Sequence, residues 1–145
     1  MLNKSQVEEI DIELEKLVFL CNAEEGNLGL FELLQEMGYY SYLTIAQKHE
    51  FTSELLSILV NDGLLNIERF ERYDDEKCIE IISNEKLEDT LKNHQSWLPS
   101  TTNVLIIVLT KEGNKYLDKN YNSYKERIHN RLFGEANFGI TRIKE

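Results

Sequence analysis

Several side chains between residues 48 and 77 have the chemistry needed to contact a nucleic acid. A helix is expected to end at Asn61, and its exposed face would present hydroxyl, carboxylate and amide groups that can pair with base edges. These groups belong to Ser53, Glu54, Ser57 and Asn61. Positive charge that could neutralise phosphates is supplied nearby by Lys48, His49, Arg69, Arg72 and Lys77. Together these residues are the candidate contacts to double-stranded DNA.

The charge of the chain argues against a simple, tight contact with duplex DNA. The net charge is −10. Residues 1–110 hold 8 basic and 21 acidic residues, whereas residues 111–145 hold 8 basic and 5 acidic residues. Proteins that bind DNA usually carry a basic stripe, because phosphate neutralisation supplies most of the non-specific affinity. An acidic main body would instead suit a basic protein partner.

Catalytic and metal-binding chemistry is poorly represented. His49, His94 and His129 are scattered and lack Cys or carboxylate partners at ligand spacing. The seven glycines are isolated, so the chain has no phosphate-cradling loop. We therefore expect no enzyme activity, no cofactor and no bound metal. Cys21 and Cys78 are expected to be reduced thiols with a structural role.

Length and composition predict one globular domain over residues 1–145. The chain is 41% hydrophobic and 29% charged, which is typical of a folded protein. The longest apolar run, Val104 to Leu109, is far too short for a membrane helix. The N-terminus lacks the apolar region of a secretory signal. We expect a cytoplasmic protein without membrane contact.

The elements that must position the candidate contacts begin at Leu43. The stretch 43–65 predicts two short helices and the start of a strand, and the second helix buries apolar residues at helical spacing. Thr52 could N-cap that helix, or the turn could lie near Gln47. Gly63 is suited to the left-handed position after the helix. The predicted buried face holds Phe51, Leu55, Ile58 and Leu59.

A strand hairpin and an insertion are predicted next. Strands at 64–72 and 77–83 would enclose an acidic tip at 74–76. Residues 84–103 would form an insertion with a short helix at 85–93. Trp97 is expected to anchor this insertion in the core, and the alternative is a lid, a partner loop or the edge of an effector pocket. Residues 104–110 predict a strand buried on both faces.

Amphipathic helices are predicted at both ends of the chain. The first, over residues 5–21, begins with a capping box at 5–8, and a loop at 22–27 and a second helix at 28–37 ending at Gly38 would follow. The last, over residues 111–133, is capped by Thr110 and ends at Gly134. Each terminal helix could pack on its own domain or form a homodimer. The dimer contacts would be Val7, Ile10, Leu14, Leu17, Leu117, Tyr121, Tyr124 and Ile128.

Two motifs resemble those of winged-helix regulators of the MarR-like and PadR-like families. Leu59-Val-Asn-Asp-Gly-Leu-Leu65 resembles the end of the recognition helix and the first wing strand. Leu109-Thr-Lys-Glu-Gly113 resembles the element that follows the wing. The resemblance implies a mainly α fold with a small antiparallel β wing (α+β). Residues 39–83 would form the helix-turn-helix and wing hairpin, and 104–110 would complete the wing sheet.

The resemblance also implies a function. It indicates a dimeric, DNA-binding transcriptional regulator whose terminal helices form the homodimer and whose second short helix enters the major groove. The alternative is an acidic winged-helix protein–protein interaction module that does not bind duplex DNA.

Overall fold

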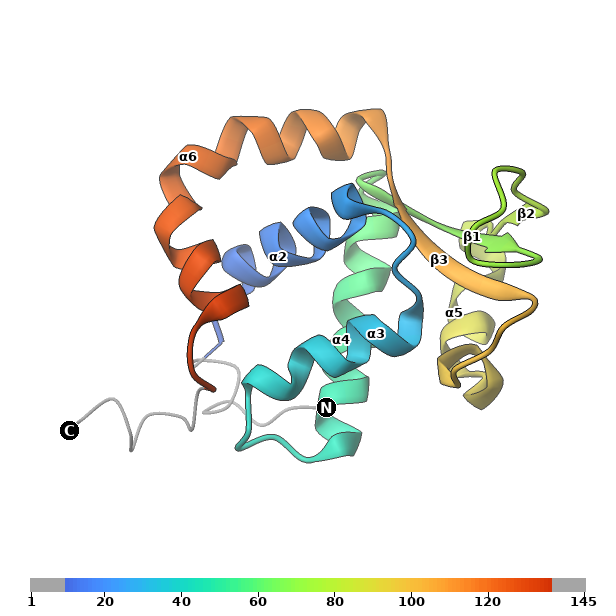
Figure 1. Ribbon diagram of the computed structural model, residues 1–145, viewed down its shortest axis with the longest axis horizontal. Helices are drawn as coiled ribbons and strands as arrows, with labels where there is room; N and C mark the ends of the chain where they lie inside the picture. Colours follow the sequence, from blue (N-terminus) through green and yellow to red (C-terminus); the bar gives the residue numbers. More distant parts are fainter. Residues whose placement is uncertain (1–9, 137–145) are drawn as a thin grey trace.

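The computed structural model describes residues 10–136, in which helices pack beside a small antiparallel sheet (Figure 1). The prediction of a mainly α chain with a small antiparallel sheet is confirmed. The helices are α2 (Ile12–Glu25), α3 (Leu30–Glu36), α4 (Ile45–Asn61), α5 (Asn84–Lys92) and α6 (Lys111–Phe133). Two 3₁₀ turns, η1 (Met37–Tyr39) and η2 (His94–Trp97), follow α3 and α5, and the strands are β1 (Leu65–Phe70), β2 (Glu80–Ile81) and β3 (Val104–Leu109).

The sheet has the strand order β2-β1-β3, with both pairings antiparallel. β3 pairs with β1 along its whole length, and its first four residues are buried, as the continuous apolar run predicts. The predicted hairpin between β1 and a returning strand is also confirmed. The returning strand is shorter than predicted, because β2 pairs with β1 only through Glu80 and Ile81. An isolated bridge from Gly29 to Ile106 continues the sheet beyond β3.

The predicted pair of short helices between residues 43 and 61 is wrong, because α4 is one continuous helix. Thr44 is its N-cap and forms a capping box with Gln47: the Thr44 Oγ1 accepts from the Gln47 N–H at 3.1 Å, and the Gln47 Oε1 accepts from the Thr44 N–H at 2.9 Å. Thr52 lies within the helix, where its Oγ1 donates to the Lys48 carbonyl at 2.7 Å. A helix-turn-helix in this chain would therefore consist of α3, residues 37–44 and α4.

The N-terminal elements also differ from their prediction. α2 begins at Ile12, since Asp11 is the N-cap and its Oδ1 accepts from the Leu14 N–H at 3.1 Å. It continues to Glu25, so most of the predicted loop at 22–27 is helical. The predicted capping box at 5–8 lies outside the described residues. Gly38 does not end α3, because the chain passes directly from α3 into η1.

The start of α6 is built as the sequence predicts. The Thr110 Oγ1 accepts from the Gly113 N–H at 2.9 Å and donates to the Gly63 carbonyl at 2.6 Å, so one hydroxyl caps α6 and joins it to the end of α4. Gly63 has a φ of 77°, which is the left-handed position predicted for it. A Cβ on Gly113 would lie 2.0 Å from the Leu64 carbonyl oxygen. Only glycine allows this close packing of α6 on the chain entering β1.

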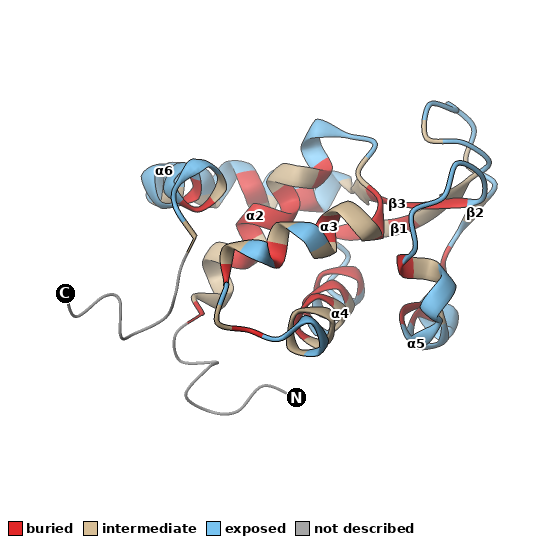
Figure 2. Cartoon of the chain, turned by 60° about the horizontal axis from the view of Figure 1, so that its bottom comes forward, coloured by how far each residue is buried: buried red, intermediate tan, exposed pale blue. Residues whose placement is uncertain are grey.

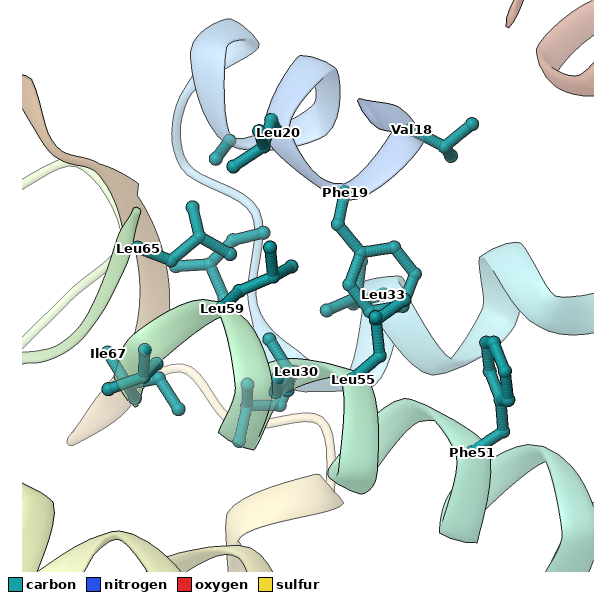
Figure 3. Packing of buried hydrophobic residues seen from close by; sticks show 14 of the residues in the cluster. Val18, Phe19, Leu20, Leu30, Leu33, Phe51, Leu55, Leu59, Leu65 and Ile67 are labelled. Atoms are coloured by element: carbon teal, nitrogen blue, oxygen red, sulfur yellow. The ribbon is translucent and has the colours of Figure 1, made fainter. Parts of the chain in front are cut away.

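The core lies where α2, α3, α4 and the sheet meet. Figure 3 shows Phe19 of α2 reaching toward Leu33 of α3 and Leu55 of α4, and all three side chains are buried. Leu59 is also completely buried, so the predicted apolar face of α4 is largely confirmed. Ile58 is the exception: it is 42% exposed and lies on the solvent side of the helix.

A buried ion pair joins α2 to α6, which passes over and around α2 (Figure 1). Arg131 donates to the Glu15 carboxylate from Nε at 2.8 Å and from Nη2 at 3.0 Å, and the Tyr40 hydroxyl donates to the same carboxylate at 2.7 Å. Nη2 of Arg131 also donates to the Glu36 carbonyl at 3.1 Å. The Arg131 guanidinium lies 4.5 Å from the centre of the Tyr39 ring. This cluster fixes the end of α6 against α2 and η1.

Candidate functional site

The polar stripe of α4 that could pair with base edges packs beside α5. His49, Ser53 and Ser57 lie one turn apart on the same side of α4. Figure 2 shows α4 and α5 side by side. Between them is a groove of about 400 Å³, here called the α4–α5 groove. Its lining residues are His49, Glu50, Ser53, Glu54, Ser57, Glu88, Leu91 and Lys92.

The insertion is held firmly against α4. Leu87 and Leu91, one turn apart on α5, are both buried. The Trp97 indole is buried and its Nε1 donates to the Leu91 carbonyl at 2.8 Å, while its ring centre lies 4.3 Å from that of His49. The predictions of a short helix at 85–93 and of Trp97 as a core anchor are confirmed. The insertion is therefore a packed part of the α4 surface.

His49 and the two serines of the groove are poorly placed for contact with DNA. Burial and the charge of His94 lower the pKa of His49, which favours the neutral form of its ring. Ser53 and Ser57 are half-buried, and the Ser53 Oγ has no hydrogen-bond partner among the described residues. Glu54 and Asn61 are exposed, and Lys48 is half-buried.

The α4–α5 groove is acidic. Glu50, Glu54 and Glu88 contribute three carboxylates and Lys92 one ammonium group. Lys92 is bonded to Glu88, with an Nζ to Oε1 distance of 2.6 Å, and this contact lowers the pKa of Glu88. The groove therefore keeps a net negative charge at neutral pH. Such a surface repels phosphate and attracts cationic groups.

The predicted cations of the hairpin are dispersed. Arg69 lies on β1 and its Nε is 3.4 Å from Glu80 on the paired strand. Arg72 and Lys77 are exposed on the turn that joins β1 to β2, where residues 74–76 add three exposed carboxylates. None of Arg69, Arg72 and Lys77 lines the α4–α5 groove with the polar stripe of α4.

The predicted dimer contacts are mostly buried within one copy of the chain. Ile10, Leu17, Leu117 and Ile128 lie in the core where α2 packs on α6. Leu14 and Tyr124 are half-buried, Tyr121 is exposed, and Val7 lies outside the described residues. The packing of the terminal helices on each other therefore accounts for their apolar seams, and the homodimer stays a prediction.

Neither cysteine is part of the candidate site. Both are free thiols, and burial together with Glu24 and Glu25 raises the pKa of Cys21 to about 11. Within residues 10–136, no group of three or more His, Cys, Asp and Glu side chains could hold a metal ion. In the same part of the chain, no helix has the length and apolarity needed to span a membrane.

Sequence reasoning missed Glu88 and Lys92, the α5 side of the groove. A signal for it exists, because Leu87 and Leu91 form an apolar pair on an otherwise polar helix and must cover another apolar surface. The sequence gives no indication that this surface is α4.

Comparison with known proteins identifies no relative of this chain. No protein-family model matches the chain, and no curated protein or solved structure matches it.

Proposed function

We propose that the chain is an acidic winged-helix protein–protein interaction module. Its α4–α5 groove binds a basic segment of a partner protein. The observation that carries this proposal is the packing of α5 against the polar stripe of α4, which leaves a groove with three carboxylates and one paired ammonium group.

The winged-helix part of the proposal is supported by the order of elements. α3, residues 37–44 and α4 follow one another as a helical pair with a turn, and β1 begins four residues after α4 ends. β1 and β3 are antiparallel neighbours, so residues 71–103 form one long connection between two paired strands. In the winged-helix interpretation this connection belongs to the wing, and it includes β2, α5 and η2.

The size of the α4–α5 pair argues against entry into DNA on this side. An α-helix with side chains is about 10–12 Å wide, and packed helices lie about 8–10 Å apart, so the pair is about 20 Å wide. The major groove is only about 12 Å wide and accepts a single helix. With α5 in place, Ser53 and Ser57 cannot reach base edges from this side. Negative charge in the groove adds a repulsive term against phosphates.

A basic peptide tests the proposal directly. The probe is a labelled 15-residue helical peptide of Lys and Leu, titrated into the full chain and followed by fluorescence anisotropy, with an acidic Glu/Leu peptide as its counterpart. A Glu50→Gln/Glu54→Gln/Glu88→Gln variant removes the groove carboxylates. The matched control, Glu24→Gln/Glu76→Gln/Glu126→Gln, removes the same charge from exposed positions elsewhere.

The proposal expects binding of the basic peptide alone and a loss of about tenfold in the groove variant, since three exposed charged contacts of about 0.5 kcal/mol each sum to about 1.5 kcal/mol. The control variant should bind nearly as the unmodified chain does. Equal losses in the two variants would mean that the peptide senses only net charge, and the groove would then not be the interface.

The dimeric DNA-binding regulator is the second candidate, and the same order of elements favours it. Arg72 and Lys77 are exposed near the end of the hairpin, where they could contact phosphates. Its test is anisotropy of duplex DNA from upstream of the gene at low and moderate salt, together with light scattering. Sequence-selective, salt-sensitive binding by a dimer would support this candidate over the interaction module. A monomer without DNA binding at low salt would exclude it.

A further inference from the structure

A second cavity lies away from the α4–α5 groove and shares no residue with it. It encloses about 390 Å³ between α3, the end of the β1–β3 pair and the loop that follows η2. Cavities of this size are common for small-molecule sites. We call it the Arg69 cavity, because Arg69 is the one lining side chain with an ionised group.

Arg69 is in an unusual position for an arginine. Side chains alternate along a strand, so Arg69 lies on the same face of β1 as Leu65 and Ile67, both of which are completely buried. Along this face of β1, the buried side chains of Leu65 and Ile67 are therefore followed by the Arg69 guanidinium, at the point where the core ends. Glu80, its cross-strand neighbour, meets only Nε, at 3.4 Å. A guanidinium has five N–H donors, so this contact leaves most of its capacity unused.

The other lining groups are neutral. Phe31, Leu98 and Pro99 supply the accessible apolar surface, and Leu30, Val104 and Leu105 lie behind it, almost completely buried. Amide and hydroxyl side chains complete the wall at Asn93, Gln95, Ser96, Ser100, Thr102 and Asn103. The lining holds one cation and no carboxylate, and the Glu80 carboxylate that pairs with Arg69 Nε lies outside the lining.

The loop at residues 100–103, which contributes to the lining, forms hydrogen bonds within itself and to the β1–β2 turn. The Ser100 Oγ donates to the Thr102 carbonyl at 2.6 Å, and the Asn103 N–H donates to the Glu71 carbonyl at 2.8 Å. Tyr73, which also lines the cavity, donates from its hydroxyl to Glu32 on α3 at 3.5 Å. These bonds join the lining to α3 and to the start of the β1–β2 turn.

We infer that the Arg69 cavity binds a small organic acid with one carboxylate and a short apolar chain. The carboxylate accepts from the Arg69 guanidinium, a charge-assisted contact that can be bidentate. The short apolar chain packs on Phe31, Leu98 and Pro99. A dianion such as phosphate would need a second cation, which the lining lacks. The site does not depend on the proposed protein interaction.

The probes are hexanoate and its neutral counterpart hexanamide, which differ only in the charged group. Each is titrated into the ¹⁵N-labelled full chain, and the backbone amides are followed by NMR. Hexanoate should cause saturable shifts in residues 93–105 and 69–73 with a dissociation constant on the order of millimolar, and hexanamide should bind about tenfold more weakly. Arg69→Gln should remove the difference between the two probes, while Arg69→Lys should retain part of it.

Arg72→Gln is the matched control, because Arg72 is exposed and does not line the cavity. This variant should preserve the preference for hexanoate. Equal binding of hexanoate and hexanamide, saturable shifts located elsewhere, or no saturable shift would each overturn the inference. An equal loss of preference in Arg69→Gln and Arg72→Gln would also overturn it, since the effect would then come from net charge.

Discussion

Replacing Arg131 with Met should destabilise the fold by about 3–5 kcal/mol, because it leaves the Glu15 carboxylate buried without its cation. Glu15 is 0% exposed and Arg131 is 3% exposed, so water cannot take over the lost contacts. Two hydrogen bonds to Glu15 and one to the Glu36 carbonyl disappear together. The cation–π contact with Tyr39 is lost as well.

The same reasoning predicts that removing the whole cluster is much less costly. A Glu15→Leu/Tyr40→Phe/Arg131→Met variant removes the buried carboxylate and leaves no unsatisfied hydroxyl, and the half-buried Glu36 carboxylate loses Arg131 in this variant and in Arg131→Met alike. Replacing a buried ion pair by apolar residues of similar size is often neutral or stabilising. We expect this triple variant to be at least about 2 kcal/mol more stable than Arg131→Met alone.

Urea unfolding followed by circular dichroism measures both variants. Arg127→Met is the control, since Arg127 is on the same helix and pairs with Asp11 at the surface. A surface pair contributes about 0–1 kcal/mol, so this variant should barely change the unfolding midpoint. If Arg131→Met were no more destabilising than Arg127→Met, the cluster would not be buried as described.

Three further predictions concern the core, a close contact and the pH dependence of stability. Leu59→Ala should lower the free energy of unfolding by about 2–5 kcal/mol, because Leu59 is completely buried; an unchanged midpoint in urea would contradict its place in the core. Gly113→Ala should cost about 1–3 kcal/mol, because the new Cβ would lie 2.0 Å from the Leu64 carbonyl oxygen, whereas Asn114→Ala, at an exposed position, should change little in the same assay. Burial raises the pKa of Glu36, and Glu15 and Glu25 add to this while Arg131 opposes it, so ionisation of Glu36 weakens the folded state. The stability contributed by the protonated Glu36 carboxyl is fully present below the unfolded pKa of about 4.3 and is lost as the pH rises through the folded pKa. Glu36→Gln cannot ionise, so it should be more stable than the unmodified chain at pH 7 and about equal to it near pH 4, as measured by thermal unfolding.

Elements with strong local chemistry could be predicted from the sequence. β3 follows from an uninterrupted apolar run, and α6 follows from Thr110 as its cap and an amphipathic pattern after it. Gly63 and Gly113 also follow, since each occupies a position that other residues tolerate poorly. β3, the cap of α6 and Gly63 depend on residues that are close together in sequence, whereas the contact that requires a glycine at 113 is with Leu64, far away in sequence.

α4 shows how local chemistry can favour the wrong boundary. Thr52 has the side chain of an N-cap, but the helix continues through it because its hydroxyl is satisfied by the Lys48 carbonyl. The correct signal was present in Thr44 and Gln47, which have the spacing of a capping box. The apolar face that begins at Phe51 does not distinguish the two possibilities, since both bury it.

The candidate site and the ion pair depend on contacts that no local pattern encodes. Glu15 and Arg131 are 116 residues apart, and the only hint of their pairing is a glutamate between Leu14 and Leu17 in an apolar stripe. The groove depends on α5, which follows β2 in the chain, packing against α4. Sequence reasoning could identify the polar stripe of α4 but not the helix that packs beside it.

The packing of α5 also gives a physical reason for the charge of α4. A helix that enters the major groove approaches phosphates and gains affinity from Lys and Arg on its exposed face. α4 instead has Glu50 and Glu54 at the rim of a groove shared with α5, and Lys48 is its one Lys or Arg. With α5 beside this stripe, Lys or Arg residues on it would gain no affinity from DNA phosphates. Carboxylates at the same positions do not oppose the binding of a cationic protein segment. The packing of α5 against the polar stripe and the scarcity of Lys and Arg on α4 are thus both consistent with the proposed binding of a cationic protein segment.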